Sequence, residues 1–240
     1  MRVLLAVLVV AAFTALAVAA TTSGTASKAP ASAVNVPARA TADPANTART
    51  DVSPPMGSSP GQGRGISPVI RGLLVPIEGA EIPTAPELLP NSIREYRAGW
   101  HEGIDFPADR GTAVRAAAAG TVIRVDREFV DWDAASLNAA LEAAIALGYT
   151  SDDTLDRIRG RQVWIDHGRH LVTRYAHLDR VEDLYVGETV TRGQLIGAVG
   201  SSGFEEGGPH LHFEVRVGDD YLGDLLEGDE LLRAISRAFD

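Results

Sequence analysis

The chain has 240 residues, no cysteine and a formal net charge of −10 at pH 7. Without cysteine it can form neither disulfides nor thiolate metal sites, so any metal must be held by histidine and carboxylate side chains. The charge is uneven, because residues 1–67 carry a net +3 and residues 68–240 a net −13. An acidic region of this kind binds polyanions poorly, which argues against nucleic acid as a partner.

The N-terminus is strongly apolar. The run from Val3 to Ala20 follows a single arginine, is interrupted only by Thr14 and ends in small residues. These features are typical of a secretory signal peptide. The alternative is an uncleaved membrane anchor, because the run is about long enough to span a bilayer. Residues 1–20 are therefore predicted to be a signal peptide or N-terminal anchor of a secreted or cell-envelope protein, which would touch a membrane only through this segment.

Residues 21–67 are rich in Ala, Thr, Ser, Pro and Gly and show no apolar periodicity. Such a segment buries too little apolar surface to offset the entropy lost on ordering, so it predicts a disordered linker. Short apolar runs begin at about Pro68. Residues 68–240 are therefore predicted to form the folded domain.

Short apolar segments separated by turn residues predict a mainly β domain. The runs at 68–70 and 73–77, broken by Gly and Pro, suit strands or loops. The segment from His210 to Val217 alternates strictly and is the clearest strand. This spacing of strands favours an antiparallel sheet sandwich or open barrel. The other predicted strands are Gly120–Val125, Gln162–Asp166, Leu171–Leu178 and Leu195–Val199.

A helical pattern interrupts the predicted strands. Apolar residues recur at i, i+4 and i+8 between Ser136, a candidate N-cap, and Gly148, a candidate C-terminal glycine. A second short helix is predicted over Ser151–Gly160, and the two make a helical insertion at about 128–161. A short C-terminal helix is predicted over Asp229–Phe239.

Two histidines in the last predicted strand form the first candidate site. Because side chains alternate between the faces of a strand, His210 and His212 point to one side while Leu211 and Phe213 point to the other. Taken alone, the pair also suits two exposed polar residues on the wet face of a sheet.

A histidine and a carboxylate also lie close together at His101 and Asp105. Gly103 between them lets the backbone bend so that both can reach one ion. Ile104 and Phe106 flank Asp105 and can bury it. A buried unpaired carboxylate is costly, and a bound metal removes that cost.

Taken together, these patterns favour a metal site over separate structural roles for the histidines and the carboxylate. Two imidazoles and one carboxylate are a common ligand set for catalytic zinc, with a coordination position left open for water. Two histidines then remain for proton transfer. One of them, His177, lies in an apolar stretch, where a single histidine also suits a hydrogen-bonded core or edge position. His210 must lie close to the metal if His212 binds it, because the two share a strand face.

Three motifs, in this order, closely resemble those of the lysostaphin-type, LytM-like zinc endopeptidases. The similarity covers roughly residues 76–222 without the inserted helices, and the combination is highly specific. The motifs read His101-Glu102-Gly103-Ile104-Asp105, Tyr175-Ala176-His177-Leu178 and Gly208-Pro209-His210-Leu211-His212-Phe213-Glu214-Val215.

The resemblance implies a fold, a reaction and a site. The fold is a compact antiparallel sheet structure, of the duplicated hybrid motif kind, with a groove over the metal. The reaction is hydrolysis of peptide bonds in bacterial peptidoglycan, in stem peptides or cross-bridges, so peptidoglycan peptides are the expected partner. Matched by motif, His101, Asp105 and His212 would bind Zn²⁺, and His177 and His210 would be the catalytic histidines.

The insertion at about 128–161 departs from the family pattern. Its simpler interpretation is a tolerated surface insertion; the alternative is a lid or a site for a protein partner. A non-haem iron oxygenase would use the same three ligand types, but the export segment, the two surplus histidines and the motif order disfavour it. A cell-wall-associated binding or activator module without hydrolytic activity is the remaining alternative, disfavoured because all five matched residues are present. His167 and His170 flank a glycine turn and receive no catalytic role.

Overall fold

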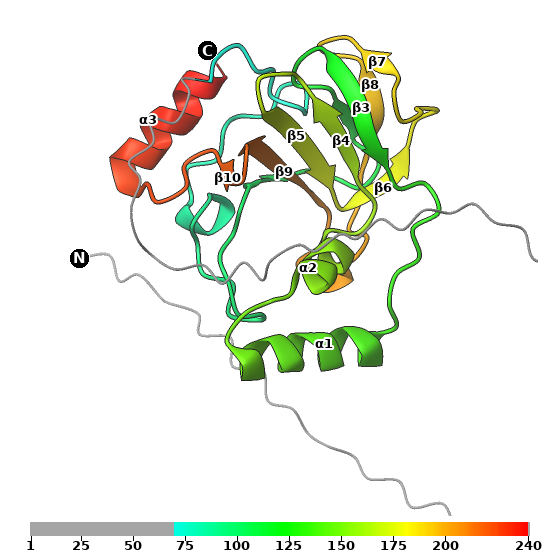
Figure 1. Cartoon of the computed structure of the whole chain (residues 1–240), viewed down its shortest axis with the longest axis vertical. Helices are drawn as coiled ribbons and strands as arrows, with labels where there is room; N and C mark the ends of the chain where they lie inside the picture. Colours follow the sequence, from blue (N-terminus) through cyan, green and yellow to red (C-terminus); the bar gives the residue numbers. More distant parts are fainter. Residues whose placement is uncertain (1–69, 240) are drawn as a thin grey trace, which may run out of the picture. The chain divides into compact units, whose positions relative to one another are not determined.

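The computed structural model describes residues 70–239 (Figure 1). The predicted signal segment 1–20, the linker 21–67 and the domain boundary near Pro68 lie outside the described residues. Among residues 70–239, no helix is both long enough and apolar enough to cross a membrane.

The described strands form two antiparallel sheets. The larger has the order β1-β9-β5-β4-β3-β7, with β10 also paired to β9, and the smaller has the order β2-β8-β6. This arrangement confirms the predicted mainly β, antiparallel fold, and the sheets do not close into a barrel. The strands are β1 Ile104–Pro107, β2 Ala113–Arg115, β3 Gly120–Val125, β4 Val163–Asp166, β5 Leu171–Ala176, β6 Leu178–Val181, β7 Thr189–Val190, β8 Leu195–Val199, β9 His210–Val217 and β10 Asp220–Tyr221.

The core lies beneath the larger sheet, on the face that β9 fills with alternate residues. Leu211 and Phe213 are fully buried there, as the alternating pattern predicted. Tyr175 on β5 packs against Phe213, with ring centroids 5.2 Å apart. Its hydroxyl accepts a hydrogen bond from the backbone N–H of Ala117 at 2.7 Å. These contacts fix β5 and β9 rigidly beside each other.

One sequence prediction on the strands needs correction. The segment predicted as one strand, Leu171–Leu178, is two strands that belong to different sheets, because His177 has a left-handed backbone (φ 58). The run at 73–77, for which the sequence left both strand and loop open, is a loop. Its Leu73 N–H donates to the Ala238 carbonyl at 2.9 Å, and its Pro76 carbonyl accepts from the Arg115 N–H of β2 at 2.8 Å.

The helices are α1 Ala134–Leu147, α2 Asp152–Arg159 and α3 Gly228–Ala238, with short 3-10 turns η1 Pro86–Leu88 and η2 Glu205–Gly207. All three predicted helices are therefore present. Asp133, not Ser136, is the N-cap of α1, because its carboxylate accepts from the Ser136 N–H at 2.8 Å. Gly148 is the C-cap as predicted, with φ 76.

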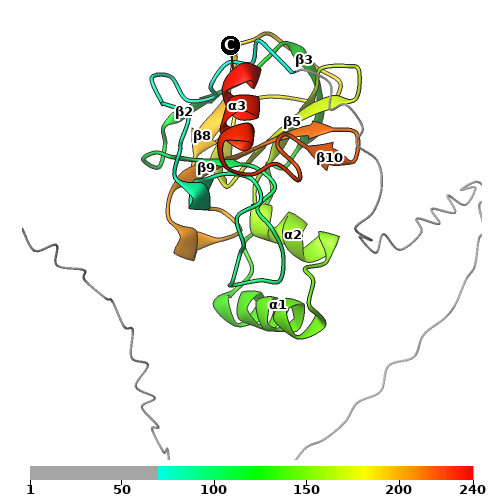
Figure 2. The ribbon, with the colours of Figure 1, turned by 90° about the vertical axis from the view of Figure 1, so that its left-hand side faces the viewer.

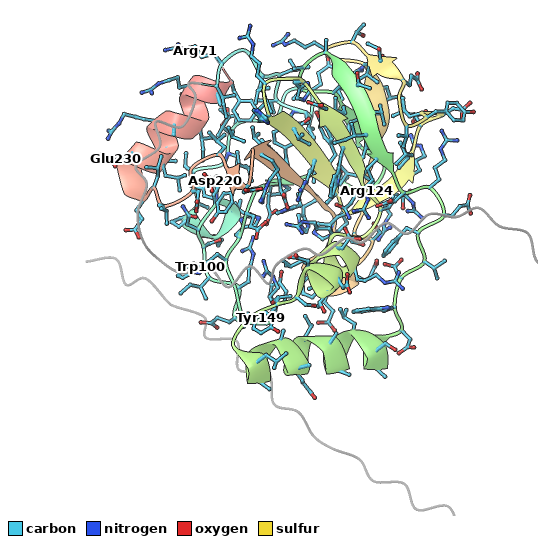
Figure 3. All side chains as sticks on the ribbon, in the orientation of Figure 1. Arg71, Trp100, Arg124, Tyr149, Asp220 and Glu230 are labelled. Carbon is cyan, nitrogen blue, oxygen red and sulfur yellow. The ribbon has the colours of Figure 1, made fainter. Side chains whose placement is uncertain are left out.

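The helical insertion and the C-terminal helix lie on different sides of the sheets (Figures 1 and 2). The turn between α1 and α2 contacts the loop that precedes β1, since Thr150 Oγ1 donates to the Ala98 carbonyl at 2.7 Å. Figure 3 shows Trp100 and Tyr149 on these neighbouring segments, each more than half exposed. The insertion is thus joined to the loop that carries the first histidine motif.

Candidate metal centre and active site

Pairing of β1 with β9 brings a carboxylate and a histidine together. Asp105 and His212 are direct partners in the antiparallel register, so their side chains share one face. His212 Nδ1 lies 2.8 Å from Asp105 Oδ1. Both side chains are buried, and Arg94 donates to the second carboxylate oxygen of Asp105 at 2.7 Å. The register therefore leaves one oxygen of Asp105 facing one nitrogen of His212.

His101 reaches the same point from the loop before β1. Its ring Nδ1 lies 2.9 Å from the Leu89 carbonyl. A ring that donates there keeps Nε2 unprotonated, which is the usual way a metal-binding histidine is oriented. This Nε2 lies 3.0 Å from both Asp105 Oδ1 and His212 Nδ1.

The converging atoms fit a zinc ion. One ligand atom from each of His101, Asp105 and His212 lies within 4.8 Å of the others. A tetrahedral site with bonds of about 2.0–2.1 Å separates its ligand atoms by about 3.3 Å, so the triangle needs to widen by only a few tenths of an ångström. Two imidazole nitrogens and one carboxylate oxygen also leave a fourth position open.

Glu214 contacts the ring nitrogen of His212 that faces away from Asp105. It is fully buried, and its Oε1 lies 3.1 Å from His212 Nε2. Arg159 donates to the same oxygen at 2.6 Å, and Arg174 to the other oxygen at 3.2 Å. Burial by itself would raise the pKa of Glu214, but these arginines and His212 lower it well below its usual range. Glu214 therefore stays ionised and can hold His212 with Nδ1 toward Asp105.

Asp105 is likewise held in its charged form. Burial raises the pKa of its carboxyl group, but charge interaction and hydrogen bonding with His101, together with the contact to His212, lower that pKa well below the usual range. An ionised carboxylate is the form that binds a cation.

Two further histidines, His177 and His210, lie beside this cluster with ring centroids 4.6 Å apart. The Nδ1 of His177 is 2.9 Å from the Ser202 carbonyl, and that of His210 is 2.9 Å from the Gly208 carbonyl. Donation from Nδ1 leaves Nε2 of each ring free. Burial, followed by the charges of His210 and His212, lowers the pKa of His177 to about 3, so this ring is neutral near pH 7.

All five residues line one pocket of about 210 Å³. Tyr96 and Phe204, from loops before β1 and after β8, also line it and stack with ring centroids 4.5 Å apart. Helix α2 contributes Leu155, Ile158 and Arg159 to the wall. The insertion is therefore part of the site, and its interpretation as a passive surface insertion does not hold for α2.

The other two histidines of the described chain lie elsewhere. His167 has its ring nitrogens 2.8 Å from the Ala119 carbonyl and 2.8 Å from Thr173 Oγ1. His170 is exposed in a turn with φ 64. Neither lines the pocket, in agreement with the sequence analysis.

Sequence reasoning did not single out the charged residues around the cluster. Glu214 could have been found, because it lies two residues after His212 and so on the same strand face. Arg94 and Arg97 come from an irregular loop, and Arg159 from the insertion. No periodicity marks these three, since only the packed fold brings them to the pocket.

Comparison with known proteins agrees with this geometry. Residues 99–223 match the sequence model described as Peptidase family M23. The chain belongs to this family. The matched segment contains all five candidate residues. Family M23 confirms the resemblance inferred from the three motifs, and with it the predicted class of enzyme, a zinc metallopeptidase.

Several curated relatives carry descriptive names. The DD-carboxypeptidase/endopeptidase Mpg of Neisseria meningitidis is 32% identical over 142 residues, which are 58% of this chain and 26% of that protein. The peptidoglycan DD-endopeptidase ShyC of Vibrio cholerae is 32% identical over 117 residues, 49% of this chain and 20% of that protein. A metalloprotease of Haemophilus influenzae is 33% identical, over 49% of this chain and 18% of its own length. The chain thus matches about a quarter or less of these relatives.

Solved structures of peptidases also align with the chain. A zinc-containing peptidase from Vibrio cholerae has 26% identity and a TM-score of 0.45, covering 63% of this chain and 39% of that one. The catalytic domain of lysostaphin from Staphylococcus simulans has 26% identity and a TM-score of 0.36, covering 55% of this chain and 75% of that one.

Gly103 provides a test of the M23 site, because its lack of a side chain gives His212 room. The sequence analysis expected this glycine to bend the backbone, but its φ is not positive. A Cβ there would lie 2.7 Å from the Phe213 carbonyl oxygen and 2.8 Å from His212 Cε1. Gly103→Ala is expected to displace the His212 ring and lower zinc affinity by about 10- to 100-fold, measured by competition with a chromophoric chelator.

Gly168→Ala is the matched control. Gly168 is exposed with φ 79, and nothing lies within 4 Å of a Cβ placed there. Its replacement strains the backbone by about 1–2 kcal/mol and is expected to leave zinc affinity unchanged. Zinc affinity of Gly103→Ala equal to that of the parent chain would show that His212 does not depend on this space.

Proposed function

We propose that the chain is a zinc-dependent endopeptidase that hydrolyses peptide bonds in bacterial peptidoglycan. The observation that carries the proposal is the meeting of His101, Asp105 and His212 beside His177 and His210 in one pocket of an M23 chain. The substrate is supported by relatives that are named as peptidoglycan DD-endopeptidases.

In this proposal His101 Nε2, Asp105 Oδ1 and His212 Nδ1 hold the zinc ion. Such an ion, when bound, lowers the pKa of a coordinated water toward neutrality and polarises a carbonyl group. Leu89, Arg94 and Glu214 keep the three ligand atoms pointed at one place through their contacts with the other atoms of each ligand.

His177 and His210 carry out proton transfer between the attacking water and the leaving amine. Each ring has its Nδ1 directed at a backbone carbonyl, so Nε2 is the atom that can exchange protons in the pocket. An Nε2 that takes a proton from the attacking water can deliver it to the leaving amine. The protonated ring can also donate a hydrogen bond to the oxyanion that develops on the scissile carbonyl.

We also propose that the protein acts outside the cytoplasm, where peptidoglycan lies. The apolar run from Val3 to Ala20 supports export by a signal peptide or N-terminal anchor. In this organisation residues 21–67 form the linker and residues 68–240 the peptidase domain. The linker composition suits a tether that gives the domain reach.

Mass spectrometry of released peptidoglycan fragments tests the proposal. The purified, zinc-loaded chain is incubated with isolated peptidoglycan sacculi, with and without a chelator. Release of peptide fragments that stops with the chelator and returns when zinc is added back is the expected result, and the fragment masses identify the cleaved bond. If zinc-loaded protein binds sacculi of several peptidoglycan types but releases nothing, the chain is a binding module and not a hydrolase.

A further inference from the structure

Arg97 is the one buried arginine among residues 70–239, at 7% exposure. It lies in the loop before β1 and lines the pocket that holds the metal cluster. Its Nη2 donates to the Trp100 carbonyl at 2.6 Å. Its Nε has no hydrogen-bond partner, and within the described residues no ion pair joins it to a carboxylate.

The neighbouring arginines of the pocket differ from Arg97. Arg94 forms an ion pair with Asp105 at 2.7 Å. Arg159 forms ion pairs with Glu102 at 2.8 Å and Glu214 at 2.6 Å. A guanidinium stays charged at any physiological pH, and a buried charge without a counter-ion is costly. Arg97 is therefore the pocket cation that has no carboxylate partner among residues 70–239.

The loop is shaped to hold this guanidinium in place. Gly99 has φ 150, a conformation that favours glycine. A Cβ on Gly99 would lie 2.5 Å from Arg97 Nη1, so a side chain at this position would displace the guanidinium from where it lies. The bridge between Ile93 and Trp100 closes the loop and sets the carbonyl that accepts from Nη2. The cation is thus fixed by its own loop before any ligand arrives.

We propose that Arg97 binds a carboxylate group of the peptide held in the pocket. The proposal rests on the proposed peptidase function and adds a feature of the substrate, namely an acidic group beside the scissile bond. Arginine presents paired N–H donors that match a carboxylate, and such charge-assisted bonds are stronger than neutral ones. The carboxylate supplies the counter-ion that the described residues do not.

The charge of the domain bears on which peptides can reach Arg97. Residues 68–240 carry a net −13, so most of the domain repels an anionic peptide. Arg94, Arg97 and Arg159 line the pocket together with Glu102 and Asp105. Because Arg94 and Arg159 are paired with carboxylates, Arg97 is the lining arginine that remains, among the described residues, to attract an acidic group. The carboxylate has two chemical sources, the free α-carboxylate at the end of a peptide or an acidic side chain next to the scissile bond.

Binding of matched peptides separates these sources. The probes are a stem peptide ending in D-alanyl-D-alanine, its C-terminal amide, and the same two peptides with the acidic side chain before that dipeptide converted to a carboxamide. Titration calorimetry is performed on the full zinc-loaded chain carrying His210→Ala, which is expected to slow turnover by about 10²- to 10⁴-fold during the measurement. We expect one of the two carboxylates, when amidated, to weaken binding by roughly 10- to 100-fold.

Adding Arg97→Gln should produce the same weakening for the carboxylate peptide and change the corresponding amide by less than about twofold. Arg97→Lys keeps the charge but not the paired donors and should lie between. Arg233→Gln removes one exposed charge on α3 and should have no effect. If Arg97→Gln weakens acid and amide equally, Arg97 only shapes its loop and the proposal is wrong.

Two further outcomes test the carboxylate site and the peptidase proposal separately. Parent protein that binds all four peptides equally, or none of them, would overturn the carboxylate site. Hydrolysis of sacculi is measured separately on the unmodified chain. Arg97-dependent binding of the acid without any hydrolysis would contradict the peptidase proposal and leave the carboxylate site standing.

Discussion

Replacing His212 with alanine is expected to remove the bound metal and reduce hydrolysis to background. His212 Nδ1 lies within 3.0 Å of the candidate ligand atoms of His101 and Asp105. The two remaining donors hold a divalent ion far less tightly than three. Because enzymes accelerate their reactions by about 10⁶-fold or more, we expect kcat to fall by more than about 10⁴-fold. Zinc content is measured by elemental analysis, and activity by fragment release from sacculi.

The same variant should lose its stabilisation by zinc. A ligand that binds only the folded state stabilises it by about 2.7 kcal/mol when its free concentration is about 100-fold above the dissociation constant. The Tm of the parent chain should therefore rise with added zinc, whereas that of His212→Ala should not. His170→Asn is the control, because His170 is an exposed histidine at φ 64, where asparagine is tolerated. Full zinc content and activity in His212→Ala would refute its assignment as a ligand.

Part of the candidate site could be predicted from the strand periodicity of the sequence. Alternation over His210–Val217 predicted that His210 and His212 share one face, and Leu211 and Phe213 are indeed fully buried on the other. The flanking apolar residues also predicted a buried Asp105, which is 8% exposed. These inferences need only the two-residue repeat of a strand and the apolar character of neighbours.

The proximity of the three candidate ligands, His101, Asp105 and His212, could not be predicted from periodicity. This proximity depends on the register that sets Asp105 opposite His212, and on a loop that returns His101 to the same point. Registers and loops follow from the packing of the whole domain, so only the resemblance to a family carried that prediction. The position of His177 could not be predicted from local pattern either. The apolar pattern predicted one continuous strand through His177, whereas its left-handed backbone ends that strand.

The insertion shows what family patterns leave out. Its last helical residue, Arg159, bonds to two parts of the candidate site, the backbone of His177 and the side chain of Glu214. The Arg159 carbonyl accepts from the His177 N–H at 2.8 Å, and its side chain donates to Glu214, which in turn supports His212. A strained backbone persists only where its surroundings fix it, and this contact helps to fix that of His177. The insertion, which departs from the family pattern, therefore helps to position His177 and His212 of the candidate site.

Alanine at His177 or His210 is expected to reduce turnover while leaving the metal in place. Neither ring supplies an atom to the three-atom cluster of His101, Asp105 and His212. Each instead directs Nδ1 to a carbonyl and keeps Nε2 for the pocket. General acid–base catalysis contributes about 10²- to 10⁴-fold, so we expect kcat to fall by that factor at unchanged zinc content.

Combining the two substitutions separates their roles. If both histidines serve one proton transfer, the double variant should be no slower than the slower single variant; if they serve different steps, the losses should multiply. Because burial holds the pKa of His177 at about 3, this ring enters the reaction neutral, and its loss should not shift an acidic limb near pH 6. Loss of zinc from either single variant would make that histidine a ligand, and unchanged kcat in both would remove them from the mechanism.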